Sequence, residues 1–367
     1  MPEWARERDE EVSPLPKYLS VFKQLLEAHG GPGFEEDVRN LILPHLSEYA
    51  SQIWTDPLGN LVGLVPGVGE GRRPRVLVSA HIDEIALVVT RIEAGGFLRL
   101  AQAGGFDPRA LVGQEVLVHT QSGRIFGVIG AKPPHLTPPS ERSKAAKLED
   151  LYVDLALPEE EVRSRVRIGD RVTIHRAPLD LLNGRIAGKS VDNRASAAVL
   201  LEALALLKGM AHSADLYAVF TVQEEVGLRG ARTAGFGLAP DIAIAVDVTF
   251  GAFPGQAPDE SFPLEGGVAI SFGPNLHRRV FKRLVDCAEK YRVPYQIELS
   301  QRPVGADANA FQISGPGLAA ALIGPPIRYM HTSVETVAYD DIWQCARLLA
   351  HYVAEVDAAQ VEELTCY

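Results

Sequence analysis

Two adjacent glutamates, Glu224 and Glu225, end an apolar segment that begins near Phe220. Alternating side chains of a strand point to opposite faces, and neighbouring carboxylates repel each other unless a cation or water compensates them. In hydrolases with two metal ions, one such carboxylate binds metal while its neighbour takes a proton from water. The pair therefore predicts a cation-dependent hydrolytic site.

Further side chains that can bind metal occur in similar places. They follow apolar segments, begin a predicted helix or lie in a loop: His81, Asp83, Asp192, Asp247 and His331. In sheets of mainly parallel strands, ligands gather beyond the carboxyl ends of the strands. Because His81, Glu224 and Asp247 follow three predicted strands, we expect them to share one site. The set predicts a two-metal hydrolase.

Most of these residues, taken singly, also fit a structural role. His81 with Asp83 could be a core histidine beside a surface carboxylate, although metal-bound imidazoles commonly need such a carboxylate. Asp192 could cap a helix, and His331 could be a surface residue. Asp247 ends an otherwise buried strand, where an unpaired charge costs several kcal/mol, so it needs a partner.

The composition limits the class of protein. The 367 residues favour two domains, and 46% hydrophobic with 23% charged residues is ordinary for a globular chain. A net charge of −11 argues against nucleic-acid or anionic-membrane partners. Motifs of serine hydrolases, P-loop proteins and dinucleotide enzymes do not occur.

The predicted location is the cytoplasm. The three cysteines Cys287, Cys345 and Cys366 are widely spaced and form no Cys-x-x-Cys motif, which suits a reducing compartment. The charged N-terminal segment has no apolar core of a signal peptide, and no apolar run approaches the ~20 residues that span a bilayer.

Hydrophobic periodicity predicts an α/β protein with an inserted β-rich part. Helices are expected at 17–30, in a second segment that follows and ends at about 49, and at 193–208, 276–291 and 339–356. Strands are expected in a hairpin at 53–64 and at 75–80, 215–221, 241–247, 293–300 and 318–323. Short β runs alternate with Gly/Pro turns between 87 and 178. We therefore predict a discontinuous catalytic domain (1–86 and 179–367) interrupted by a small β-barrel (87–178).

Six segments together resemble one family. They occur in the order Ala80–Ile85, Val191–Ala195, Phe220–Ala231, Val246–Thr249, Gly305–Ala308 and Arg328–His331. The chain resembles the dinuclear-metal aminopeptidases of the tetrahedral (TET) type, in metallopeptidase clan MH. Members of this family are labelled glutamyl aminopeptidase, deblocking aminopeptidase or endoglucanase. The resemblance implies a phosphorylase/hydrolase-like catalytic domain with an inserted PDZ-like barrel for oligomerisation or substrate gating.

The resemblance also implies a role for each ligand. Asp192 would bridge two divalent ions. His81 and Asp247 would complete the site of one ion, and Glu225 and His331 that of the other.

Two further roles follow from the resemblance: Glu224 would be the general base, and Asp83 would orient His81. Zinc or cobalt is expected, since mixed imidazole and carboxylate ligands suit borderline metals. The implied activity is removal of N-terminal residues from short peptides. The implied assembly is a homo-oligomer, from a dimer to a tetrahedral dodecamer.

Other functions fit part of the pattern. A dinuclear N-acyl-amino-acid deacylase or a carboxypeptidase could use the same ligands. A glycoside hydrolase could use two carboxylates, but the paired histidines have no function there, and only three tryptophans are available to stack on sugars. A metal-free binding protein would leave the ligand set unexplained. The residues that bind substrate cannot be identified from the sequence.

Overall fold

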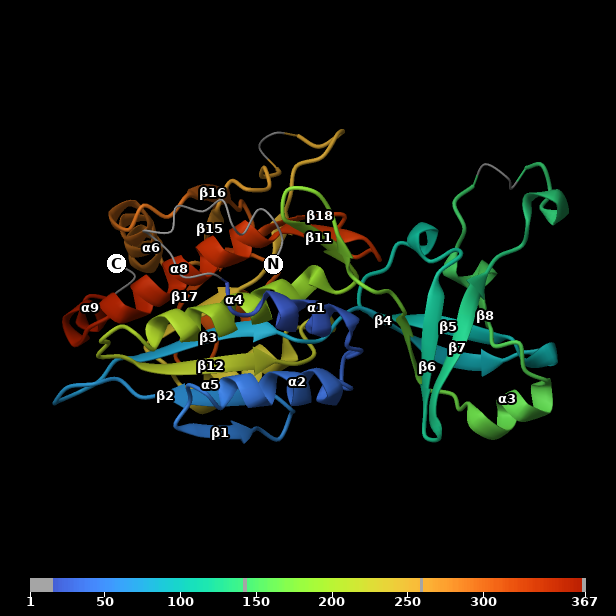
Figure 1. Ribbon diagram of the computed structural model, residues 1–367, viewed down its shortest axis with the longest axis horizontal. Coiled ribbons are helices and arrows are strands. Elements are labelled where there is room, and N and C mark those ends of the chain that lie inside the picture. Colours follow the sequence, from blue (N-terminus) through green and yellow to red (C-terminus); the bar gives the residue numbers. More distant parts are fainter. Residues whose placement is uncertain (1–15, 141–143, 258–259, 365–367) are drawn as a thin grey trace.

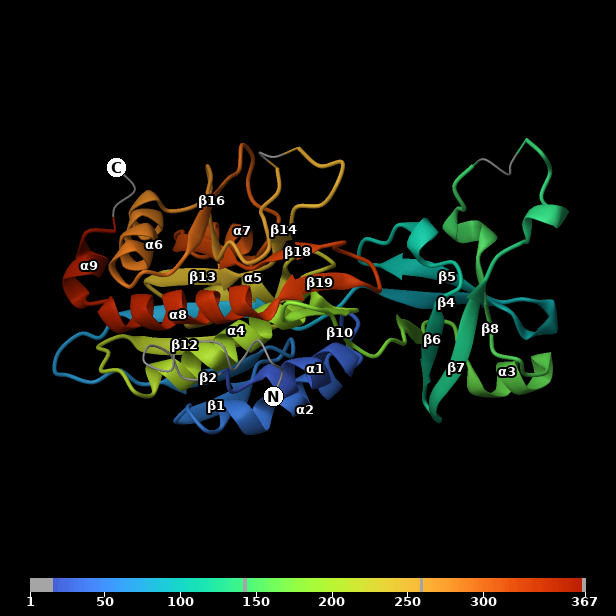
Figure 2. The same cartoon turned by 45° about the horizontal axis from the view of Figure 1, so that its top comes forward.

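The computed structural model describes residues 16–140, 144–257 and 260–364. A larger α/β part and a smaller β-barrel lie side by side along the long axis of the molecule (Figures 1 and 2). The charged N-terminal segment and Cys366 lie outside the described residues. Within the described ranges, no helix has the length and apolar character needed to cross a membrane.

An eight-stranded sheet forms the centre of the larger part. Its order is β1 (Gln52–Thr55), β2 (Leu61–Val65), β12 (Asp215–Thr221), β3 (Arg75–His81), β13 (Ile242–Val246), β17 (Ala319–Gly324), β15 (Val268–Phe272) and β16 (Tyr295–Leu299). The four central strands β12, β3, β13 and β17 pair in parallel, as expected. β2 and β15 join this centre antiparallel. The parallel centre brings the carboxyl ends of β3, β12 and β13 to one edge.

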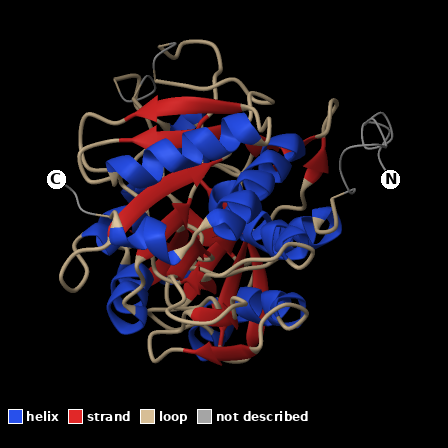
Figure 3. Ribbon diagram, turned by 90° about the vertical axis from the view of Figure 1, so that its left-hand side faces the viewer, coloured by secondary structure: helices blue, strands red, loops and turns tan. Residues whose placement is uncertain are grey.

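Helices cover both faces of this sheet (Figure 3). One face carries α1 (Leu19–Glu27), α2 (Glu36–Leu46), α4 (Val191–Leu207), α6 (Arg278–Lys290) and α8 (Tyr339–Glu355), and the other carries α5 (Arg229–Leu238) and α7 (Asp307–Gln312). Alternate side chains of β3 point to opposite faces of the sheet: Val76 and Val78 pack in one apolar cluster and Leu77 packs in the other. Full burial of each such side chain contributes about 1.5–3 kcal/mol to the stability of the sheet.

A closed antiparallel barrel forms the smaller part, as predicted for the β-rich block. Its six strands are β4 (Ala86–Ile92), β5 (Leu98–Ala103), β6 (Glu115–Thr120), β7 (Gly123–Gly130), β8 (Tyr152–Asp154) and β9 (Arg171–Ile174). The short helix α3 (Glu159–Arg165) packs on it, and the barrel has its own apolar core, which includes Leu98, Val118 and Val172. A separate core allows this part to be inserted without disturbing the larger sheet.

A second sheet, which the sequence did not predict, lies next to the site. Its five strands are β10 (Leu179–Asp180), β11 (Arg185–Gly188), β19 (Glu335–Ala338), β18 (Pro326–Arg328) and β14 (Thr249–Phe250). Strands of two to four residues are too short to show a period. This sheet places the segments that carry Asp192, Asp247 and His331 next to one another, because β11, β14 and β18 adjoin them in sequence.

The remaining elements are short. They are α9 (Ala358–Glu362) and the 3₁₀ turns η2 (Ala94–Gly96), η3 (Pro108–Ala110), η4 (Pro134–Leu136) and η5 (Leu148–Asp150). None of them carries a predicted site residue.

Candidate metal centre

The predicted ligands form two groups that share one residue. The first is His81, Asp192 and Asp247, and the second is Asp192, Glu225 and His331. Within each group, one ligand atom of every residue lies within 4.8 Å of the others. The structure therefore brings together all five residues that were expected to bind metal.

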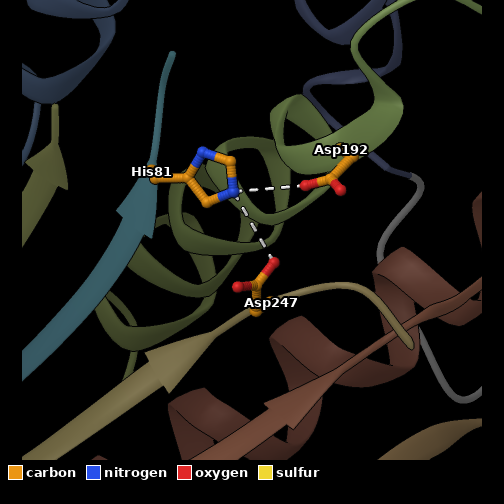
Figure 4. Close-up of side chains that lie close together, drawn as sticks. All are labelled: His81, Asp192 and Asp247. Atoms are coloured by element: carbon orange, nitrogen blue, oxygen red, sulfur yellow. Dashed lines mark hydrogen bonds and ion pairs between the residues drawn. The ribbon is translucent and has the colours of Figure 1, made fainter. Parts of the chain in front are cut away.

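The first group joins two strand ends and the start of a helix (Figure 4). The Nε2 atom of His81, the last residue of β3, lies 3.2 Å from Asp192 Oδ1 and 3.8 Å from Asp247 Oδ1. Asp247 directly follows β13, which runs parallel to β3. A Cβ atom at Gly324 would overlap the carbonyl oxygen of Asp247, so glycine permits this close approach.

The second group faces the other oxygen of Asp192. His331 Nε2 lies 3.4 Å from Asp192 Oδ2 and 3.4 Å from Glu225 Oε1. His331 is in the loop between β18 and β19, and its side chain is 34% exposed. The alternative that His331 is a plain surface residue does not account for these contacts.

Among the hydrogen bonds of the described residues, the Asp192 carboxylate has the His81 imidazole as its partner and no backbone amide of the helix. The backbone dihedral ψ of Asp192 is 104°, so regular helical geometry begins only after Asn193. The two carboxylate oxygens face two different imidazoles, those of His81 and His331. This arrangement suits a carboxylate that is shared between two cations.

Asp83 contacts both His81 and the glutamate pair. The Nδ1 atom of His81 lies 3.2 Å from the backbone carbonyl of Asp83 and 3.5 Å from its carboxylate. The Asp83 carboxylate also accepts hydrogen bonds from the backbone amides of Glu224 (3.0 Å) and Glu225 (3.1 Å). A hydrogen bond from Nδ1 leaves Nε2 free to act as a ligand.

Glu224 lies beside the ligand groups but belongs to neither. Its Oε2 is 3.9 Å from His81 Nε2. The preceding residue, Gln223, has a φ of 56°, and its amide donates to Glu35 Oε1 at 3.1 Å. Backbone in this region is uncommon outside glycine and clusters at functional sites. The contribution of Glu35 was missed, because it comes from a loop 188 residues away.

The electrostatics of the ligand groups favour a cation. Burial raises the pKa of Glu224 to about 10 and that of Asp247 well above its ordinary value. Hydrogen bonds to Asp192 and Glu225 raise the pKa of His331 to about 11. Burial thus favours the neutral form of these carboxyl groups, and the carboxylates favour the protonated form of His331. A bound divalent cation would balance the negative charge of the carboxylates in place of these protons. The donor set, imidazole and carboxylate, fits a borderline divalent metal.

The ligands and Glu224 line a cavity of about 590 Å³. Its other walls include the apolar side chains of Val248, Val304, Leu322 and Met330, and the described residues that line it include no lysine or arginine. This volume is within the range of small-ligand sites, about 300–1,000 Å³. The cavity is therefore large enough for a small ligand beside the two ligand groups.

Known proteins resemble the chain over nearly its whole length. A family model described as M42 glutamyl aminopeptidase matches residues 59–348. A lysyl aminopeptidase of Pyrococcus furiosus is 34% identical over 92% of this chain and 96% of its own. A TET aminopeptidase of a Thaumarchaeota archaeon superimposes with a TM-score of 0.90 at 31% identity, covering 95% and 99% of the chains. The TET1 peptidase of Pyrococcus horikoshii, described as assembling into a tetrahedron or a large octahedral shell, gives a TM-score of 0.81 at 30% identity over 93% and 100%.

Proposed function

Because this chain belongs to the M42 glutamyl aminopeptidase family, we propose that it removes N-terminal residues from short peptides, with two divalent metal ions and Glu224 as the general base. The observation that carries this proposal is the sharing of Asp192 between two ligand groups in one cavity. His81 and Asp247 would hold one ion, and Glu225 and His331 the other. Zinc or cobalt fits these donors.

Different residues of the site would have different roles in peptide hydrolysis. When bound, divalent ions polarise the scissile carbonyl and lower the pKa of water. Glu224 would take the proton of the attacking water and deliver it to the leaving amine. Its elevated pKa would fall beside cations, since a nearby positive charge favours the carboxylate. Asp83 would hold His81 and the backbone of the glutamate pair in place.

We propose that the barrel takes part in self-association or in access to the cavity. The support is the relative from Pyrococcus horikoshii, which is described as forming closed shells, together with the separate core of the barrel. The assembly of this chain would lie between a dimer and a tetrahedral dodecamer.

Metal removal and substrate choice test the proposed function together. We expect the purified protein to hydrolyse aminoacyl-p-nitroanilides, to lose this activity after dialysis against a chelator, and to regain it with zinc or cobalt. N-acetyl amino acids should remain intact, because the proposed enzyme requires a free N-terminal amine. Cleavage of N-acetyl amino acids instead would favour a deacylase or carboxypeptidase. Hydrolysis of cellulose that survives the chelator would favour a glycosidase.

A further inference from the structure

Glu335 is a buried carboxylate next to the ligand groups that is not a member of either. It begins β19, and only 2% of its surface is exposed. Its Oε1 accepts a hydrogen bond from the backbone amide of His331 at 2.7 Å, and its Oε2 accepts one from the backbone amide of Asp192 at 2.9 Å. One side chain thus joins two segments that carry ligands and are far apart in sequence.

Both backbone segments need an external anchor. His331 has a φ of 62°, and Ser190, two residues before Asp192, has a φ of 54°. Non-glycine residues adopt this conformation at a cost of about 1–3 kcal/mol unless the surroundings determine it. The two hydrogen bonds of Glu335 fix the amides at which these segments turn toward the cavity.

The backbone of Glu335 is held by strand pairing. Glu335 pairs with Gly188 in the register of β11 and β19, and Gly188 lies four residues before Asp192. The short second sheet therefore places the backbone of Glu335 next to the start of the segment that leads to Asp192. This pairing restrains the backbone of Glu335 relative to the segment that leads to Asp192.

We propose that Glu335 is a positioning residue of the metal centre, which sets the distance between Asp192 and His331 by binding both of their backbone amides. The inference rests on the proposed function, since it assumes that these residues bind metal. Glu335 should affect mainly the second group, because two of its three ligand residues, Asp192 and His331, are bound by Glu335. In the first group, His81 and Asp247 make no contact with Glu335 among the hydrogen bonds of the described residues.

The test is zinc binding to the chelator-treated full chain, measured by competition with a fluorescent chelator. In Glu335→Gln, the amide group would offer an acceptor to one backbone amide and a donor to the other, so one anchor is lost. Removal of groups that orient metal ligands typically weakens metal affinity by about 10–100-fold. We expect the zinc affinity of the second group to fall by this factor, with a smaller decrease in the zinc affinity of the first group. Activity should return as the zinc concentration rises.

Glu202 provides a matched control on the same helix as Asp192. It is also buried, with 1% of its surface exposed, and accepts hydrogen bonds from the backbone amides of Lys17 (3.1 Å) and Tyr18 (2.7 Å). Glu202→Gln should lower thermal stability as Glu335→Gln does. It should leave both zinc affinities at their wild-type values, because it anchors no ligand.

The outcomes separate the inference from the proposed function. Wild-type zinc affinities in Glu335→Gln, or an equal loss in Glu202→Gln, would overturn the positioning role alone. A wild-type chain that binds no zinc would overturn the proposed centre and this role with it. Glu335→Asp keeps the carboxyl group but is one methylene too short to reach both amides. It should show the same loss, and it decides the matter if the glutamine variant does not fold.

Discussion

Replacement of Glu224 by glutamine should abolish most peptidase activity while both metal ions remain bound. Glutamine has nearly the same shape but cannot accept a proton, and a positioned general base contributes about 10²–10⁴-fold to the rate. Glu224 belongs to neither ligand group, although it lines the same cavity. We therefore expect kcat to fall by about that factor with little change in KM. Steady-state kinetics and metal analysis of the same preparation measure both effects.

Glu225 supplies the control for this experiment, since it is the neighbour that contacts His331. Glu225→Gln should lose metal as well as activity. If Glu224→Gln retains full activity together with its metals, Glu224 is not the base. If it loses a metal ion, Glu224 acts as a ligand instead.

Replacement of Asp192 by asparagine should weaken the binding of both ions. Asp192 is the only residue common to the two groups, and its two oxygens face different imidazoles. Asparagine keeps the shape but offers one neutral oxygen and an amide nitrogen that cannot bind a cation. We expect the affinity for zinc to fall at both sites by more than the roughly 10–100-fold typical of residues that only orient ligands. Equilibrium dialysis followed by elemental analysis measures the bound metal.

His331→Ala is the matched comparison, because His331 belongs to the second group alone. It should weaken one site and leave the other closer to its wild-type affinity. Two zinc ions bound to Asp192→Asn with wild-type affinity would show that Asp192 does not bridge them. Thermal unfolding of the metal-free forms shows whether either variant is damaged in its fold.

The positions of the strand-end residues could be predicted from the sequence for a simple reason. His81 and Asp247 follow short apolar segments, and buried strands of this type pair in parallel with their carboxyl ends at one edge. The local sequence pattern and the sheet topology therefore both predict that these two residues lie close together. The inserted barrel was also predictable, because the period of the sequence changes from helical to strand-like along that block.

Elements that lack a clear period were missed. The helix α5 contains three glycines, Gly230, Gly235 and Gly237, which weaken the helical signal. The strands of the second sheet have only two to four residues, so alternation cannot show in them. Their existence depends on pairing between distant segments, which a local pattern does not contain.

The residues that hold the ligands were missed for a related reason. Glu35 and Glu335 act on backbone amides and not on side chains, and their partners Gln223 and Asp192 lie 188 and 143 residues away. Any segment can offer a backbone amide, so no residue type marks the partner. Only the folded chain shows which carboxylate meets which amide.

The central claim is that five side chains hold two ions that share Asp192. Anomalous X-ray scattering from crystals of the zinc- or cobalt-loaded protein tests it most directly. We predict two peaks, one at a ligand distance of about 2.0–2.2 Å from His81, Asp192 and Asp247, and one at that distance from Asp192, Glu225 and His331. A single peak, or peaks that do not contact Asp192, would contradict the account.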